Sequence, residues 1–194
     1  MAAGMLAAAT RAALRTHPLE IGSAKVIAGI AGALDGDLER GSAFVTLAYV
    51  QLNLVTGAYR LADAGHGLHF IIRDCGAAVE HVSSKDMPIG MCGDWHDMCG
   101  VLEPGDAALL VSDGVMDLWG GTVESLYEAV ERCVRQYCGD AHATIEALCL
   151  GAADAADIDD VTAVIMGREP ARVPQAAASA QGTPAAVGDP SDVG

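Results

Sequence analysis

A short apolar run at residues 107–111 constrains the fold more than any other stretch of this sequence. A Pro-Gly pair at 104–105 precedes the run and Ser112 follows it. Because it is too short for a free-standing helix, it fits a strand that is buried on both faces. Asp113 stands at the mouth of this strand, where Gly114 lets a ligand or another backbone come close. The carboxylate is therefore either aimed into a site or part of an ordinary Asp-Gly turn.

Strand patterns lie close together through most of the chain and are joined by short turns. This spacing indicates antiparallel sheets rather than βαβ units. A Thr-Gly pair at 56–57 predicts a hairpin between two of the strands. The predicted strands cover residues 44–54, 58–64, 69–73, 79–82, 95–102, 107–111 and 161–166.

Helical patterns flank the strands at both ends of the sequence. The strongest spans residues 123–137, where apolar residues recur every three or four positions. The other predicted helices cover residues 1–17, 23–34 and 141–152, the second ending at an Asp-Gly-Asp triplet. The sequence after residue 167 lacks periodicity and is rich in Ala, Pro, Gly and Ser, so it predicts one domain at 1–167 and a disordered tail at 168–194.

Composition excludes several classes of function. Acidic residues outnumber basic ones 26 to 11 and give a formal net charge of −15, which disfavours binding to nucleic acid or to an anionic membrane. No apolar segment approaches the roughly 20 residues of a membrane span. The six cysteines form no C-x-x-C pair and match no zinc pattern, so a reduced, cytoplasmic protein is the simplest interpretation.

A second group of acids precedes the last predicted strand. Asp159 and Asp160 stand directly before it. If this strand and the one before Asp113 are antiparallel neighbours, their ends meet and the carboxylates come within bridging reach, because strands lie about 5 Å apart. Oxygen ligands favour a hard ion such as Mg²⁺ or Mn²⁺. The alternative is an acidic helix end beside an unrelated turn.

These motifs carry a family resemblance. Val111-Ser-Asp-Gly-Val-Met-Asp117 followed by Asp159-Asp-Val-Thr162 is similar to the closing metal motifs of PPM-type (type 2C) serine/threonine protein phosphatases. The bacterial branch that resembles the phosphatase domain of stage II sporulation protein E fits best. Further matches follow in the family's order at Phe44-Val-Thr-Leu47, Thr56-Gly57, Ala64-Gly-His66, Pro88-Ile-Gly90 and Leu102-Glu-Pro-Gly-Asp106.

The resemblance implies an α+β fold, a four-layer αββα sandwich of two stacked antiparallel β-sheets flanked by α-helices. It also implies that a pair of Mg²⁺ or Mn²⁺ ions activates a water that attacks phosphoserine or phosphothreonine, so no side chain serves as the nucleophile. Asp113 and Asp159 match family metal ligands. Asp160, next to Asp159, is expected either to be a third metal ligand or to support the other two. Three more residues are expected on the active-site face, and they are Gly114, Asp117 and His66, whose side chain either orders a loop or acts as an acid.

The sequence departs from the family at its start. The family's first strands supply a Gly-Asp pair and a further Asp ahead of a Gly-His-Gly turn, and one of these aspartates bridges the two metals. No counterpart precedes Met1. We therefore expect an N-terminally truncated domain that lacks the bridging ligand and has an open sheet edge.

Two functions remain open at this point. The first is a metal-dependent phosphoprotein phosphatase of bacterial signalling that acts on a phosphorylated anti-sigma-factor antagonist. The second is a non-catalytic regulatory module that keeps the fold and binds a protein partner. An unrelated divalent-metal hydrolase is a third, weaker alternative.

Overall fold

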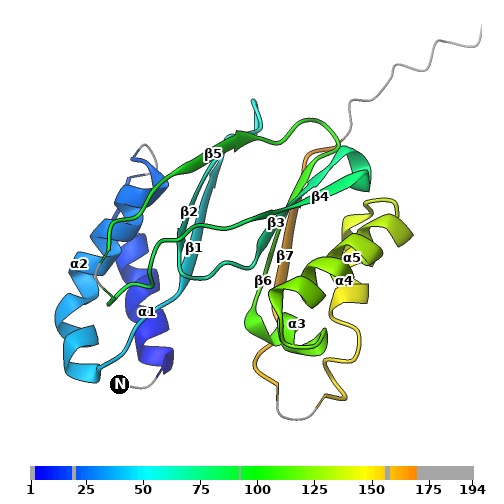
Figure 1. The fold of residues 1–194 in the computed structure, drawn as a ribbon. Helices are drawn as coiled ribbons and strands as arrows, with labels where there is room; N and C mark the ends of the chain where they lie inside the picture. The colour runs from blue at the N-terminus through cyan, green and yellow to red at the C-terminus, as the bar shows by residue number, and fades with distance from the viewer. Residues whose placement is uncertain (1–2, 19–20, 92, 156–157, 170–194) are drawn as a thin grey trace, which may run out of the picture.

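Two antiparallel sheets are stacked between two layers of helices (Figure 1). The computed structural model describes residues 3–18, 21–91, 93–155 and 158–169. This arrangement confirms the predicted αββα sandwich. One outer layer contains α1 (Ala3–Leu14) and α2 (Ser23–Gly41), and the other contains α3 (Asp113–Leu118), α4 (Val123–Gln136) and α5 (Ala141–Leu148).

The two sheets differ in size but follow the same antiparallel rule. The first has the strand order β1-β2-β5 and the second has the order β4-β3-β6-β7. The strands of the first sheet are β1 (Leu47–Leu52), β2 (Ala58–Ala64) and β5 (Met98–Val101). Those of the second are β3 (His69–Arg73), β4 (Ala78–Val82), β6 (Ala107–Val111) and β7 (Ala163–Gly167), with a short 3₁₀ turn, η1 (Asp74–Gly76), between β3 and β4.

Each sheet packs one face against its own helices. The apolar stripe of α4 includes Leu126, Val130 and Val134, which are fully buried against the second sheet together with Phe70. A second core lies between α2 and the first sheet. Because burial of apolar surface is the main favourable term in folding, these two helix–sheet cores stabilise the four layers.

The helix α2 is longer than the sequence predicted. Its predicted end at the Asp-Gly-Asp triplet is wrong, because the helix continues to Gly41. Leu34 and Leu38, four positions apart, are only 2% and 3% exposed and extend the buried stripe by a further turn. Packing of these two leucines outweighs the weak helix propensity of Gly36 in the exposed face.

Two other boundaries also differ from those that the sequence predicted. The predicted strand at 44–54 begins only at Leu47, and Val45 makes an isolated bridge to Ile89. Arg168, the first residue of the predicted tail, belongs to the domain, because its guanidinium donates to the carbonyls of Thr56 and Leu102. The residues from 170 onward, to which the prediction of disorder mainly applied, lie outside the described part of the chain.

Strand β1 forms an open edge of the first sheet. All six of its residues are only partly buried. The backbone amide of Asn53 donates a hydrogen bond to the carbonyl of Ala58. In an antiparallel pair only every second residue bonds to the partner strand, so the backbone N–H and C=O groups of Ala48, Val50 and Leu52 point away from β2. Within the described residues no strand pairs with this edge.

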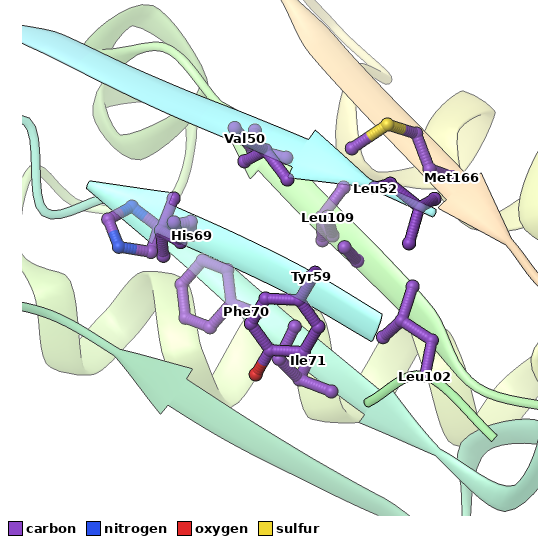
Figure 2. A pocket seen from close by; sticks show the side chains of 12 residues that line it. Val50, Leu52, Tyr59, His69, Phe70, Ile71, Leu102, Leu109 and Met166 are labelled. Atoms are coloured by element: carbon purple, nitrogen blue, oxygen red, sulfur yellow. The ribbon is translucent and has the colours of Figure 1, made fainter. Parts of the chain in front are cut away.

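The space between the sheets is filled mainly by apolar side chains. Ile71, Leu102 and Ala108 form its small buried cluster. Beside them lies a cavity of about 20 Å³, which Val50, Leu52 and Met166 help to line (Figure 2). A cavity of this size is far below the 300–1,000 Å³ typical of ligand pockets, so this cavity is too small to hold a substrate.

Candidate functional site

The ends of β6 and β7 meet, as the sequence predicted. The two strands are antiparallel neighbours, with Val111 opposite Ala163. Beyond them the pairing continues for one more residue, because the amide of Ser112 donates to the carbonyl of Thr162 over 2.9 Å. Asp113 therefore follows the end of β6 at the same pole of the sandwich at which Asp159 and Asp160 precede β7.

The side chain of Ser112 joins the two acidic segments. Its hydroxyl donates to the carbonyl of Asp160 over 2.8 Å and accepts from the amide of Thr162 over 2.9 Å. Ser112 is also the N-cap position of α3, which begins at Asp113. This short helix was not predicted, and it turns Asp113 and Asp117, four positions apart, onto the same side of the pole.

Gly114 lets the two segments approach closely. An added Cβ at this residue would lie 2.5 Å from the carbonyl oxygen of Asp159 and 2.6 Å from that of Asp160. Real Cβ atoms do not tolerate such distances, so the contact requires glycine. The sequence predicted that Gly114 allows another backbone to come close, and the backbone at 159–160 is that neighbour.

The carboxylates at this pole point into solvent. Asp113, Asp117, Asp159 and Asp160 are all exposed. One oxygen of Asp113 accepts from the amide of Gly114, and one oxygen of Asp159 accepts from the amide of Asp160. Among the described residues no group of three or more His, Cys, Asp or Glu side chains is close enough to hold a metal ion. The metal assignments of Asp113, Asp159 and Asp160 therefore stay predictions.

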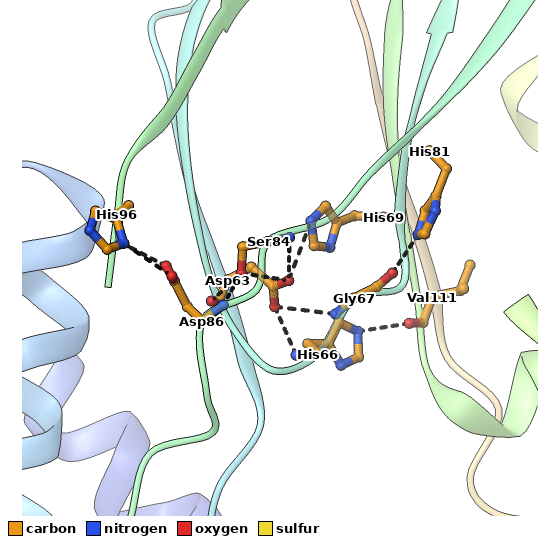
Figure 3. Close-up of polar contacts among 9 residues, drawn as sticks. All are labelled: Asp63, His66, Gly67, His69, His81, Ser84, Asp86, His96 and Val111. Atoms are coloured by element: carbon orange, nitrogen blue, oxygen red, sulfur yellow. Dashed lines mark hydrogen bonds and ion pairs between the residues drawn. The ribbon is translucent and has the colours of Figure 1, made fainter. Parts of the chain in front are cut away.

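His66 reaches this pole from the first sheet. Its Nε2 lies 2.9 Å from the carbonyl oxygen of Val111 (Figure 3). A carbonyl oxygen only accepts hydrogen bonds, so Nε2 carries the proton in this contact. Of the two roles that the sequence left open for His66, the geometry matches the ordering of a loop.

Asp63 was missed by the sequence analysis, although it holds the turn that carries His66. It lies in β2 with 1% of its surface exposed. One carboxylate oxygen accepts from the amides of His66 and Gly67 over 2.7 and 3.2 Å, and the main-chain carbonyl accepts from the Ser84 hydroxyl over 3.1 Å. The available signal was an acid between two alanines near the end of a strand, just before a Gly-His-Gly turn.

His69 is the second buried polar residue near this turn. It is 3% exposed, and neither of its ring nitrogens has a hydrogen-bond partner in the described part of the chain. Burial lowers the pKa of His69 to about 4; Asp63, whose carboxylate lies 4.0 Å away, opposes the shift, whereas His66 and His81 add to it. The ring is therefore neutral near pH 7.

This burial makes the stability of the domain sensitive to pH. In the unfolded chain His69 titrates near 6.5, so on acidification the unfolded state takes up its proton first. The free energy of unfolding should fall as the pH drops from about 6.5 to about 4, by up to about 3 kcal/mol. Urea denaturation of the wild type and of His69→Phe at several pH values measures the effect. Equal pH profiles for the two proteins would contradict it.

The architecture is that of the PPM-type (type 2C) protein phosphatases. A model of the stage II sporulation protein E (SpoIIE) family matches residues 1–169 of the 194, so the chain belongs to this family. A search of curated proteins found no match.

Solved structures of PP2C-type phosphatases share the fold. The RsbU and RsbW domains of Rv1364c from Mycobacterium tuberculosis match with a TM-score of 0.68 and 20% identity, over 85% of this chain and 47% of that one. The SiaA-PP2C domain of Pseudomonas aeruginosa matches with a TM-score of 0.67 and 19% identity, over 85% and 70%. The catalytic domain of the serine/threonine phosphatase PstP, in complex with two manganese ions, matches with a TM-score of 0.54 and 17% identity, over 84% and 79%.

The chain thus spans about half the length of the first of these structures. None of the helices in the described residues is both long and apolar enough to cross a bilayer.

Proposed function

We propose that this chain is the core of a metal-dependent serine/threonine phosphoprotein phosphatase. The observation that carries the proposal is the junction of the β6 and β7 ends, where Ser112 bonds to the carbonyl of Asp160 and Gly114 packs against the backbone at 159–160. This junction fixes Asp113 and Asp159 at one pole of a fold that the chain shares with PP2C phosphatases.

The donors at this pole fit a hard divalent cation in kind. Asp113 and Asp159 each have one carboxylate oxygen without a hydrogen bond to the described residues, and carboxylate oxygens are the ligands that Mg²⁺ and Mn²⁺ prefer. A bound ion would supply an activated water and neutralise charge on the phosphoryl group. Asp160 and Asp117 add negative charge nearby, and His66 holds the backbone that precedes Asp113.

The names of the similar structures favour a protein substrate over a small metabolite. One similar structure joins an RsbU domain to an RsbW domain, and another is the PP2C domain of SiaA. We propose that the substrate is a phosphorylated protein of a bacterial signalling pathway, such as an anti-sigma-factor antagonist. The phosphorylated residue would approach the exposed pole, because the predicted metal ligands Asp113 and Asp159 lie there.

A non-catalytic regulatory module is the second candidate. It is favoured by one observation, which is that the described residues contain no group of three metal-binding side chains. Such a module would keep the sandwich and bind a protein partner without hydrolysing phosphate. Manganese binding separates the two candidates.

The test is to measure Mn²⁺ binding by calorimetry and phosphate release from a phosphoserine peptide, for the wild type and for Asp113→Asn. Removing a ligand should weaken metal binding and activity by at least the roughly 10–100-fold that loss of a ligand's supporting residue costs. Asp154→Asn is the matched control, because Asp154 is an exposed acid that takes part in none of the contacts that join the two strand ends.

The outcomes are distinct. Loss of binding and activity in Asp113→Asn but not in Asp154→Asn supports the phosphatase. Activity that survives Asp113→Asn overturns it. A folded wild type without measurable Mn²⁺ binding supports the non-catalytic module instead.

A further inference from the structure

We propose that Asp63 and His66 act together as positioning residues, which fix the Ser112–Asp113 corner of the second sheet from the first sheet. The inference deepens the proposed function, because the corner that they hold carries the predicted metal ligand. The geometry of the contacts does not depend on a metal.

The Asp63 carboxylate lies in an unusual environment. It is almost completely buried, and its hydrogen-bond donors are neutral, namely the amides of His66 and Gly67 and, at 3.4 Å, the amide and hydroxyl of Ser84. His69 is the nearest basic side chain described, at 4.0 Å, and it is neutral near pH 7 because burial lowers its pKa to about 4. Burying a charge without a cation costs free energy, so stabilising the fold does not by itself explain a carboxylate at this position.

Asp63 positions the chain on both sides of it. Its carboxylate fixes the two amides that follow the end of β2, and its backbone and side chain also hold Ser84, beyond the end of β4. Asp63 therefore holds the turn at 65–67 from β2, and Ser84 in turn holds Asp63. His66 projects from this turn in a defined direction (Figure 3).

His66 completes the hydrogen bonding at the end of β6 in the second sheet. The amide of Val111 donates to the carbonyl of Leu68, so the backbone groups of Val111 face β3. Strand β3 begins only at His69, and the chain turns away before it can offer Val111 another amide. The imidazole of His66 donates to the Val111 carbonyl instead, over 2.9 Å, and so replaces the missing rung of the ladder.

The hydrogen bond from His66 to Val111 is connected to the acidic pole through Ser112. Val111 is followed directly by Ser112, whose backbone and hydroxyl bond to Thr162 and to Asp160. A shift of the Val111 carbonyl therefore moves the residue that joins the two acidic segments. The contacts run without a break from Asp63 through His66 and Val111 to Ser112, and across to Asp160.

The test compares three variants of the full chain. His66→Ala removes the bond to Val111, whereas His66→Gln retains an amide donor of similar reach. His81→Ala is the matched control, because His81 Nε2 bonds to the carbonyl of Gly67 over 2.7 Å in the same turn, whereas the hydrogen bond to the Val111 carbonyl comes from His66. Hydrogen exchange of the backbone amides at 112–115, followed by NMR without metal, is the first measurement, and Mn²⁺ affinity is the second.

We expect His66→Ala to raise exchange at 112–115 and the Mn²⁺ dissociation constant about tenfold, the change that the loss of one good hydrogen bond produces. His66→Gln should recover most of the change. His81→Ala should loosen residues near 67 and leave 112–115 within about threefold of the wild type, because its lost bond belongs to a different segment.

The proposal is overturned if His66→Ala and His81→Ala have equal effects at 112–115, or if His66→Ala leaves that segment unchanged. It is also overturned if His66→Gln does not differ from His66→Ala. Should the wild type bind no Mn²⁺, the phosphatase proposal fails, and the exchange measurements alone still decide whether these residues position the corner.

Discussion

Replacing Asp106 by alanine is expected to lower the free energy of unfolding by about 2–4 kcal/mol, because it leaves three donors without their acceptor. Asp106 is 5% exposed, and its carboxylate accepts from the amides of Asp74 and Glu103 and from the guanidinium of Arg73. Burial alone would raise the pKa of this carboxyl, but these hydrogen bonds outweigh burial and hold the pKa below its ordinary value. Its stabilising effect should therefore be lost as the pH falls below about 4.

The control for this experiment is Glu80→Ala. Glu80 bonds to the same arginine through both carboxylate oxygens, but it is half-exposed, so its removal should cost less than about 1 kcal/mol. Chemical denaturation followed by circular dichroism gives both values. Equal losses for Asp106→Ala and Glu80→Ala would show that the amides of Asp74 and Glu103 do not need the Asp106 carboxylate.

Replacing Gly114 by alanine is expected to force apart the two segments of the acidic pole. The added Cβ would overlap the carbonyl oxygens of Asp159 and Asp160, both of which belong to the backbone and cannot rotate away. Overpacking of this kind costs about 1–3 kcal/mol. Because the displaced backbone carries Asp159, Mn²⁺ affinity should fall by at least the roughly 10–100-fold typical of lost ligand support.

Gly32→Ala provides the matched glycine control. Gly32 lies inside α2, and an added Cβ there meets no atom within 4 Å. Alanine should therefore stabilise the helix by about 0.5–1 kcal/mol, because glycine loses more conformational entropy on folding. If Gly114→Ala melts at the same temperature as the wild type and keeps its affinity for Mn²⁺, the close contact described here is not required.

The sequence predicted the strand positions and the strongest helix well because those features depend on local patterns, whereas the four layers were implied by the family resemblance. The apolar run at 107–111 and the acids before residue 161 placed Asp113 and Asp159 at strand ends, and antiparallel pairing then brought the ends together. The long α4 followed from its apolar period. These inferences needed only periodicity and turn chemistry.

Other features depended on contacts between segments that are distant in sequence. The continuation of α2 through Gly36 requires the buried positions of Leu34 and Leu38, which local propensity cannot reveal. The role of Asp63 depends on Ser84 and on the end of β6, and no spacing rule joins these residues. The same limit applies to Asp106, whose motif was matched to a family although its hydrogen bonds were not foreseen.

The anchoring of Arg168 has a practical consequence for labelling. Its guanidinium bonds to the carbonyls of Thr56, in the β1–β2 hairpin, and of Leu102. Arg168 directly follows β7, whose other end pairs with Val111, so it lies at the pole of the sandwich opposite Asp113. The two poles lie at least one length of β7 apart, which is about 16 Å for five extended residues. A fluorophore or affinity handle attached shortly after Arg168 should therefore report on the domain without crowding the acidic pole at which we expect phosphate chemistry to occur.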